Sequence, residues 1–225
     1  HMSIEGFGDF TGYPNRDSLS YRSVYGLDDI PTIYRGTLRR PDYCEAWSVF
    51  VELGITDDSY LMVDMEKCSP RTFLNAFLPY HPTMSIEDKF KEFLGADRIH
   101  LYSKFEWLGL FESEQNLICP TPTPAQLLQI ILERKWTLNE GDKDMLVMLH
   151  EFVYTLGNET RKVTSSMVNL GEDQVYTAMS NTVGLPVGIC AKMILTEVIT
   201  ATGVLLPITK EIYEPILEEL EQHSI

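Results

Sequence analysis

Two stretches rich in Thr, Val, Met, Phe and Tyr, at residues 145–155 and 159–169, flank a short gap that contains Gly157-Asn158. β-Branched and aromatic residues favour strands, and a short gap with Gly and Asn is typical of a hairpin turn. Apolar side chains occupy both odd and even positions here. A sheet built from these strands is therefore apolar on both faces, and each face needs a cover.

The first quarter of the chain predicts a loop, a strand and a helix in that order. Residues 3–18 are rich in Gly and aromatic side chains and predict a loop. Residues 32–39 predict a strand, in which Gly36 indicates a bulge or the close approach of another backbone or a ligand. Residues 41–53 have apolar side chains at helical spacing, and Gly54 is expected to cap that helix.

The middle of the chain is predicted to be helical. Helix starts are indicated by a Ser or Thr that can accept a hydrogen bond from a backbone N–H of the first turn. These residues are Ser69, Ser85, Ser103 and Thr123. After the hairpin, residues 173–199 predict a helix interrupted at 184–186, and residues 209–222 predict a final amphipathic helix. This order predicts an α+β fold, with a mixed or antiparallel sheet and a helical subdomain.

Charge and composition exclude several classes of partner. The formal net charge of −15 repels phosphate backbones, so we expect no nucleic-acid partner. The sequence has no apolar run long enough for a membrane helix and no apolar signal-peptide run after residue 2, so we expect a cytoplasmic protein without a membrane contact. Cysteines and histidines show no metal-ligand spacing, so we expect no metal.

The sequence lacks a motif for holding a dinucleotide. Such a site needs a strand, a G-x-G-x-x-G turn and a helix. The nearest candidate, Gly6-Phe7-Gly8 followed by Gly12, has the wrong spacing, and no hydrophobic strand precedes it. We therefore expect no Rossmann domain in this chain and no NAD or NADP bound by it.

Five of the 18 basic residues lie within 25 positions of each other and suggest an anion site. They are Arg16, Arg22, Arg35, Arg39 and Arg40. A guanidinium can hold a carboxylate through two parallel hydrogen bonds. Arg35 and Arg39 would project from one face of a regular strand, with Thr37 between them. On composition alone, surface charge that balances nearby acids is the simpler interpretation.

His150, within the first predicted hairpin strand, is a second candidate. A histidine there could act as a general acid or base near neutral pH. More often such a residue is structural, and the sequence leaves both interpretations open. No catalytic residue is assigned.

Several segments resemble, in order and spacing, the saccharopine dehydrogenase (glutamate-forming) family. These segments are Tyr13–Ser18, Tyr25-Gly26, Arg35–Arg39, Phe93–Ala96, Trp107–Phe111, Lys143–Phe152, Ala178–Pro186 and Gly203–Leu217. The resemblance spans nearly the whole chain. It covers both the single enzyme and the form fused to lysine-ketoglutarate reductase.

The resemblance implies an activity and a set of site residues. Enzymes of this family oxidise the secondary amine of saccharopine with NAD(P), and water then releases glutamate and 2-aminoadipate semialdehyde. Saccharopine has three carboxylates, which suits the arginine cluster. By position, Arg16, Thr37, Leu38 and Arg39 resemble substrate-binding residues of the family. Arg35 and His150 remain possible additions.

The resemblance also implies how the chain is organised. It would be the C-terminal substrate-binding and dimerisation part of an oxidoreductase, whose Rossmann domain binds the cofactor elsewhere. Residues 1–2 look like a tag scar, 3–60 like the start of the substrate domain, 61–140 like an inserted helical subdomain and 141–225 like a return to the substrate domain. Such a piece would form a homodimer, bind saccharopine or a similar polycarboxylate amino acid, and be inactive by itself.

Two other functions stay open. A carboxynorspermidine synthase-like dehydrogenase would act on a substrate with fewer carboxylates and more amines, so its pocket would need acids more than arginines. A non-catalytic module could instead dimerise or bind an amino acid as a sensor. The coding sequence upstream of Ser3 distinguishes them, since a G-x-G-x-x-G motif there supports an enzyme and a start codon supports the module.

Overall fold

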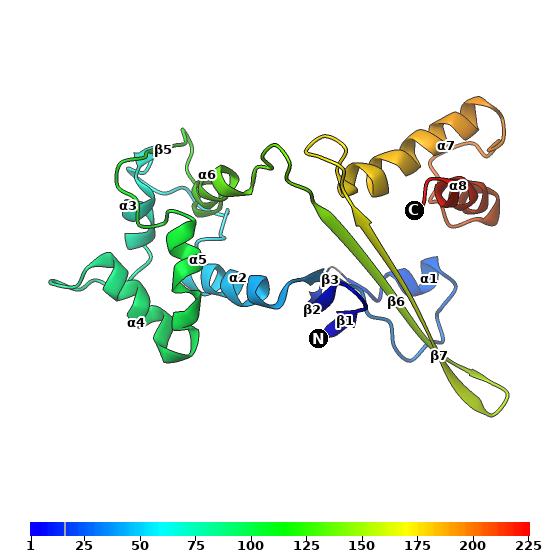
Figure 1. The fold of residues 1–225 in the computed structure, drawn as a ribbon, viewed down its shortest axis with the longest axis horizontal. Coiled ribbons are helices and arrows are strands. Elements are labelled where there is room, and N and C mark those ends of the chain that lie inside the picture. The colour runs from blue at the N-terminus through cyan, green and yellow to red at the C-terminus, as the bar shows by residue number, and fades with distance from the viewer. Residues whose placement is uncertain (16) are drawn as a thin grey trace. The chain divides into compact units, whose positions relative to one another are not determined.

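The computed structural model describes residues 1–15 and 17–225, which form two compact units (Figure 1). The first unit contains His1–Leu38 and Leu138–Ile225, and the second contains Arg39–Thr137. Helices alternate along the chain with strands that form small sheets, and every strand pairing with a described register is antiparallel. The predicted α+β class is therefore confirmed.

In its described residues, the first unit holds two sheets and three helices besides a π-helical turn. Its elements are β1 (Met2–Ile4), β2 (Gly8–Pro14), α1 (Tyr21–Val24), β3 (Gly36–Arg39, whose last residue belongs to the second unit), β6 (Met145–Leu156), β7 (Glu159–Leu170), the π-helical turn Ser180–Gly184, α7 (Leu185–Leu195) and α8 (Lys210–Gln222). The strands form one sheet in the order β1-β2-β3 and one β6-β7 hairpin.

The N-terminal segment is a sheet and not the loop that the sequence predicts. β1 and β2 are antiparallel, with Met2 opposite Phe10 and Ile4 opposite Gly8. Ile4 and Phe10 are buried, at 4% and 3% exposure, which explains why the segment pairs. The glycines conceal this pattern, because glycine is depleted in strands and adds no side chain to the alternation. The sheet also includes Met2, one of the two residues that look like a tag scar.

The β6-β7 hairpin is confirmed. Its register runs from Met145 opposite Leu170 to Leu156 opposite Glu159, so the loop has two residues. Gly157, the first of them, has a φ of 65°, a conformation that two-residue hairpin turns require and that glycine adopts without steric cost.

The helix predicted at 173–199 starts later than expected and is not interrupted at 184–186. The Asp173 carboxylate accepts hydrogen bonds from the N–H groups of Val175 and Tyr176, which holds those residues in a turn. The helix begins at Ala178, whose N–H donates to the carboxylate of Asp144, 34 residues away in sequence. Local sequence gives no sign of this distant cap. The chain then continues without a break into α7, where Pro186 fits the first turn.

The second unit is a helical domain with one two-stranded sheet. Its elements are α2 (Pro41–Leu53), β4 (Lys67–Cys68), α3 (Pro70–Asn75), α4 (Ile86–Arg98), the 3₁₀ turn Ile99–Leu101, α5 (Tyr102–Trp107), β5 (Leu117–Ile118) and α6 (Pro124–Trp136). Gly54 ends α2 in the left-handed conformation, as predicted. Ser69, Ser85 and Thr123 each accept the expected hydrogen bond at a helix start. The start predicted at Ser103 is wrong, because the preceding 3₁₀ turn leads directly into α5 at Tyr102.

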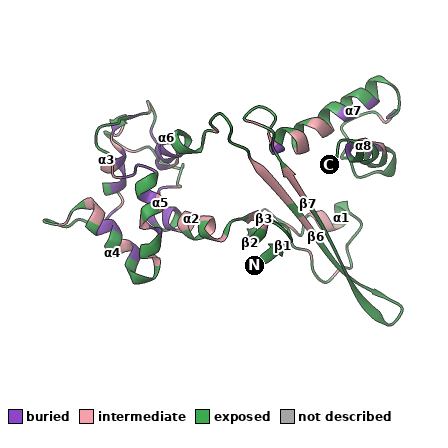
Figure 2. Cartoon of the chain, in the orientation of Figure 1, coloured by how far each residue is buried: buried purple, intermediate pink, exposed green. Residues whose placement is uncertain are grey.

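The main core lies in this helical unit, where Figure 2 shows most of the buried residues. Phe105 makes edge-to-face contacts with Phe50 and Phe90, at centroid distances of 5.3 and 5.0 Å. α2 contributes Val49, Phe50 and Leu53 to this core. The helical unit therefore begins near residue 39, whereas the sequence suggested residue 61. Helical spacing alone does not say which core a helix joins.

Candidate functional site

Two hydrogen bonds join the end of β2 to the start of β3 in the first unit. The backbone N–H of Asn15 donates to the carbonyl of Arg35 at 3.2 Å. The side-chain Nδ2 of Asn15 donates to Oγ1 of Thr37 at 3.0 Å. Thr37 therefore lies beside the residue that precedes Arg16 in sequence. Arg16 itself lies outside the described residues.

Gly36 lets these two segments approach each other. A Cβ atom at this position would lie 2.6 Å from the carbonyl oxygen of Tyr13 and 2.9 Å from Cε1 of Tyr34. Real Cβ atoms do not come so close to a backbone oxygen, so only glycine fits without movement. The close approach predicted at Gly36 is thus made by the backbone of β2.

Arg35 is held by aromatic and hydroxyl groups. Its Nη1 donates to the hydroxyl of Tyr21 at 2.8 Å, and its guanidinium carbon lies 4.7 Å from the centroid of the Tyr21 ring. The backbone N–H of Arg35 donates to Oγ of Ser18 at 3.0 Å. β3 starts only at Gly36, so Arg35 precedes the strand and the expected same-face arrangement with Arg39 does not apply.

The last two residues of β3 have apolar surroundings. The Arg39 guanidinium carbon lies 5.8 Å from the centroid of the Tyr43 ring on α2. This is a cation–π contact. A Cδ atom of Leu38 would be 3.4 Å from a Cβ at Gly12, so Leu38 packs on β2.

His150 lies on the exposed part of the hairpin. It stands opposite Ser165, and its ring is parallel to that of Phe152 at a centroid distance of 6.2 Å. None of the β6 and β7 residues that pair beside His150 is another predicted site residue. The possible role of His150 in proton transfer stays a prediction.

Asn15, Ser18 and Tyr21 contact the predicted residues but were not singled out from sequence. All three lie within five positions of Arg16, and Asn15 and Ser18 belong to the Tyr13–Ser18 segment that carries the resemblance. Their polar side chains, close to Arg16, were the feature of the sequence that could have indicated a role in the site. The sequence does not show that they contact Arg35 and Thr37, which follow later in the chain. Those contacts depend on how β2 pairs with β3.

Over residues 1–15 and 17–225, no three His, Cys, Asp or Glu side chains gather as a metal site would need. None of the helices described there has the length and apolar character needed to cross a bilayer. Burial raises the pKa of the Cys68 thiol, which disfavours the reactive thiolate.

The family model for the saccharopine dehydrogenase C-terminal domain matches residues 1–225, the whole chain. The chain belongs to this family. The chain is also similar to parts of longer proteins. The chain is 36% identical, over 224 residues, to the mitochondrial alpha-aminoadipic semialdehyde synthase of Bos taurus. It is 31% identical, over 219 residues, to the saccharopine dehydrogenase [NADP(+), L-glutamate-forming] of Saccharomyces cerevisiae.

These relatives are much longer than the saccharopine dehydrogenase C-terminal domain described here. The match covers 95% of this chain but 24% of the Bos taurus protein. It covers 94% of this chain and 49% of the Saccharomyces cerevisiae protein. The chain therefore spans between a quarter and a half of the length of these relatives.

Proposed function

We propose that this chain is the substrate-binding and dimerisation region of an NAD(P)-dependent saccharopine dehydrogenase that acts in lysine metabolism. The parent enzyme would oxidise saccharopine to glutamate and 2-aminoadipate semialdehyde. The observation that carries the proposal is the match of one family model to all 225 residues, together with relatives whose names state this reaction type.

Substrate binding is proposed for the β2–β3 region. Thr37 and Leu38 would line the site, and Arg16 and Arg39 would each hold a carboxylate of saccharopine. Two features support this. The Asn15–Thr37 hydrogen bond places the segment that precedes Arg16 against β3. The Arg39 guanidinium lies over Tyr43, a contact that orients its plane. Arg35 is a weaker candidate, because its Nη1 already donates to Tyr21.

The cofactor is proposed to bind outside this chain. The parent protein would carry a Rossmann domain that holds NAD or NADP, and the hydride would pass from saccharopine to the nicotinamide at that domain. The chain alone would then have no dehydrogenase activity. A cytoplasmic location remains an expectation, and the Bos taurus relative is named as mitochondrial.

A homodimer is proposed through the β6-β7 hairpin. Both faces of this hairpin carry exposed apolar side chains, among them Phe152 on one face and Val153 on the other, at 57% and 64% exposure. An isolated two-stranded hairpin is only marginally stable in water, and exposed apolar surface of this kind marks an interface. A second copy of the chain would cover it.

Steady-state kinetics of the full-length parent enzyme test the site. Arg16→Ala and Arg39→Ala should each lower kcat/KM for saccharopine by an amount equivalent to about 2–5 kcal/mol, because a substrate carboxylate would be left dry and unpaired. Arg39→Lys should also lower it, since lysine keeps the charge but loses the planar fork. The affinity for NAD(P) and the circular dichroism spectrum should stay unchanged. If kcat/KM of both alanine variants stayed within about threefold of wild type, the arginines would be surface charges.

A further inference from the structure

A pocket lies in the helical unit, and none of its lining residues is assigned above to saccharopine. It has a volume of about 380 Å³ and opens between α2 and α6. Its lining residues are Trp47, Thr56, Ala125, Leu128, Gln129, Leu132, Glu133, Trp136 and Thr137. The volume lies within the usual range of small-molecule sites, roughly 300–1,000 Å³.

One face of α6 forms the floor of this pocket. Leu128, Leu132 and Trp136 recur every four residues, and Gln129 and Glu133, also four apart, lie beside them, so the five residues share one side of the helix. Leu128 and Leu132 are buried, whereas Gln129, Glu133 and Trp136 are exposed. The floor is therefore apolar, and its polar groups stand at the edge.

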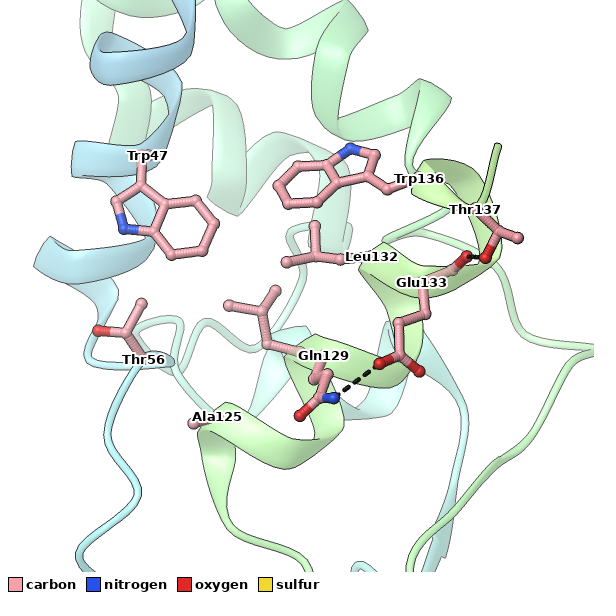
Figure 3. A pocket seen from close by; sticks show the side chains of 9 residues that line it. Trp47, Thr56, Ala125, Gln129, Leu132, Glu133, Trp136 and Thr137 are labelled. Atoms are coloured by element: carbon pink, nitrogen blue, oxygen red, sulfur yellow. Dashed lines mark hydrogen bonds between the residues drawn. The ribbon is translucent and has the colours of Figure 1, made fainter. Parts of the chain in front are cut away.

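Two indole rings form the aromatic wall. The rings of Trp47 and Trp136 lie 6.3 Å apart at an angle of 30°, and Trp47 also stacks on Tyr43 at 5.8 Å. Figure 3 shows these two indoles at one end of the pocket and Ala125 and Gln129 at the other. Trp136 is 45% exposed, which leaves much of this ring available to a ligand. Indole rings offer a large apolar surface to a ligand.

The only charged group of the lining is a carboxylate that is held in place. Nε2 of Gln129 donates to Oε1 of Glu133 at 2.6 Å (Figure 3). The neighbouring cations of α6 are engaged elsewhere, since Arg134 bonds to Gln115 and Lys135 lies over the Trp107 ring. Within the described chain, no ion pair to Glu133 is present.

We propose that this pocket binds a small organic ammonium ion with a short apolar body. The apolar part would pack on Leu128, Leu132 and the two indoles, and the ammonium group would face the carboxylate of Glu133. A neutral ligand would gain only the apolar contact, and an anion would be repelled by Glu133. This inference does not depend on the proposed dehydrogenase function, because it uses residues that are not assigned to saccharopine.

The test uses the 225-residue chain and the three indole N–H signals in its NMR spectrum. n-Butylammonium should shift the signals of Trp47 and Trp136 saturably at millimolar concentration, whereas the signal of Trp107 should not move. 1-Butanol and butyrate serve as neutral and anionic probes of the same size, at constant ionic strength. Both should bind more weakly than n-butylammonium by about tenfold or more, which corresponds to about 1.4 kcal/mol.

Glu133→Gln supplies the decisive variant, because it removes the charge, keeps the shape and changes an exposed residue. It should weaken n-butylammonium binding by about tenfold and leave 1-butanol binding unchanged. Glu92→Gln, a change at an exposed acid on α4, should alter neither. The proposal is overturned if Glu133→Gln binds n-butylammonium as wild type does, if the three probes bind equally, or if neither indole signal shifts up to roughly 50 mM.

Discussion

At the scale of single residues, Gly36 shows how the absence of a Cβ atom lets two segments of the candidate substrate site approach each other. The contact that excludes a Cβ there is with the backbone of Tyr13, which cannot move aside as a side chain tip could. We expect Gly36→Ala to lower the free energy of unfolding by about 1–3 kcal/mol, because β2 and β3 must separate locally. Urea unfolding followed by circular dichroism measures this change.

Gly188 provides the matched control for Gly36. It lies within α7, and a Cβ there would meet nothing within 4 Å. Gly188→Ala should therefore be neutral or stabilising by up to about 1 kcal/mol, because alanine favours the helix. Equal stabilities of the two variants would contradict the steric argument.

Glu87 on α4 illustrates a residue whose charge matters for stability. Nη1 and Nη2 of Arg71 bind its two carboxylate oxygens, the second at 2.8 Å. This pairing lowers the pKa of Glu87 from 4.5 to about 2. Because the folded pKa is depressed, the pairing stabilises the protein above pH 4.5, and this stabilisation is lost as the pH falls through about 2.

Glu87→Gln should therefore lower the free energy of unfolding at pH 7 by about 1–2 kcal/mol, an amount reduced by partial exposure of the pair. The difference from wild type should shrink between pH 4.5 and 2. Urea unfolding at several pH values measures it. Glu92→Gln, on the same helix but exposed, should show no such pH dependence. A difference between Glu87→Gln and wild type that stayed constant with pH would show that charge is not its cause.

At the scale of elements, the β6-β7 hairpin exposes apolar side chains on both faces, which a partner would cover. Phe152→Lys and Val153→Lys place a charge on its two faces. If the hairpin forms a dimer interface, each should shift the chain from dimer toward the 25.7 kDa monomer, because a buried lysine must lose its hydration. Light scattering at several concentrations measures the mass.

The control for the hairpin is Val204→Lys, at a fully exposed loop position. It should leave the mass unchanged. A wild-type chain that stays monomeric at high concentration would count against the hairpin as an interface. So would a dimer that survives both hairpin substitutions.

At the scale of the whole molecule, the chain divides its hydrophobic core unequally. The helical unit has a large core around Phe73, Phe90 and Phe105, whereas α7 and α8 of the first unit share a small one that includes Ile189 and Ile216. Many apolar residues of the first unit remain exposed, on the hairpin and on α7. We therefore expect a protein partner to bind to the first unit.

Cofactor binding is a property of the whole molecule that is simple to test. The sequence has no G-x-G-x-x-G turn, the motif that places a helix N-terminus against the pyrophosphate of a dinucleotide. Titration calorimetry of the 225-residue chain with NADPH should therefore show no saturable heat. Saturable binding at micromolar concentration would overturn the proposal that the cofactor domain lies outside this chain.

The sequence by itself determined the local elements. The hairpin, the helix of residues 41–53 and the capping residues Ser69, Ser85 and Thr123 follow from periodicity and turn chemistry, which act over a few positions. The family also followed from the order of short segments. For the candidate site, the sequence pointed to residues around Arg16 and Thr37, whose role in binding remains a prediction.

The tertiary structure decided what depends on contacts between distant segments. It placed residues 2–14 in two strands, because Ile4 and Phe10 are buried there, and it started a helix at Ala178 with the carboxylate of Asp144. It also joined Asn15 to Thr37 and formed the pocket at Trp47 and Trp136. The physical reason is that burial and hydrogen bonding between remote residues depend on packing, whereas local sequence carries only the preferences of each segment.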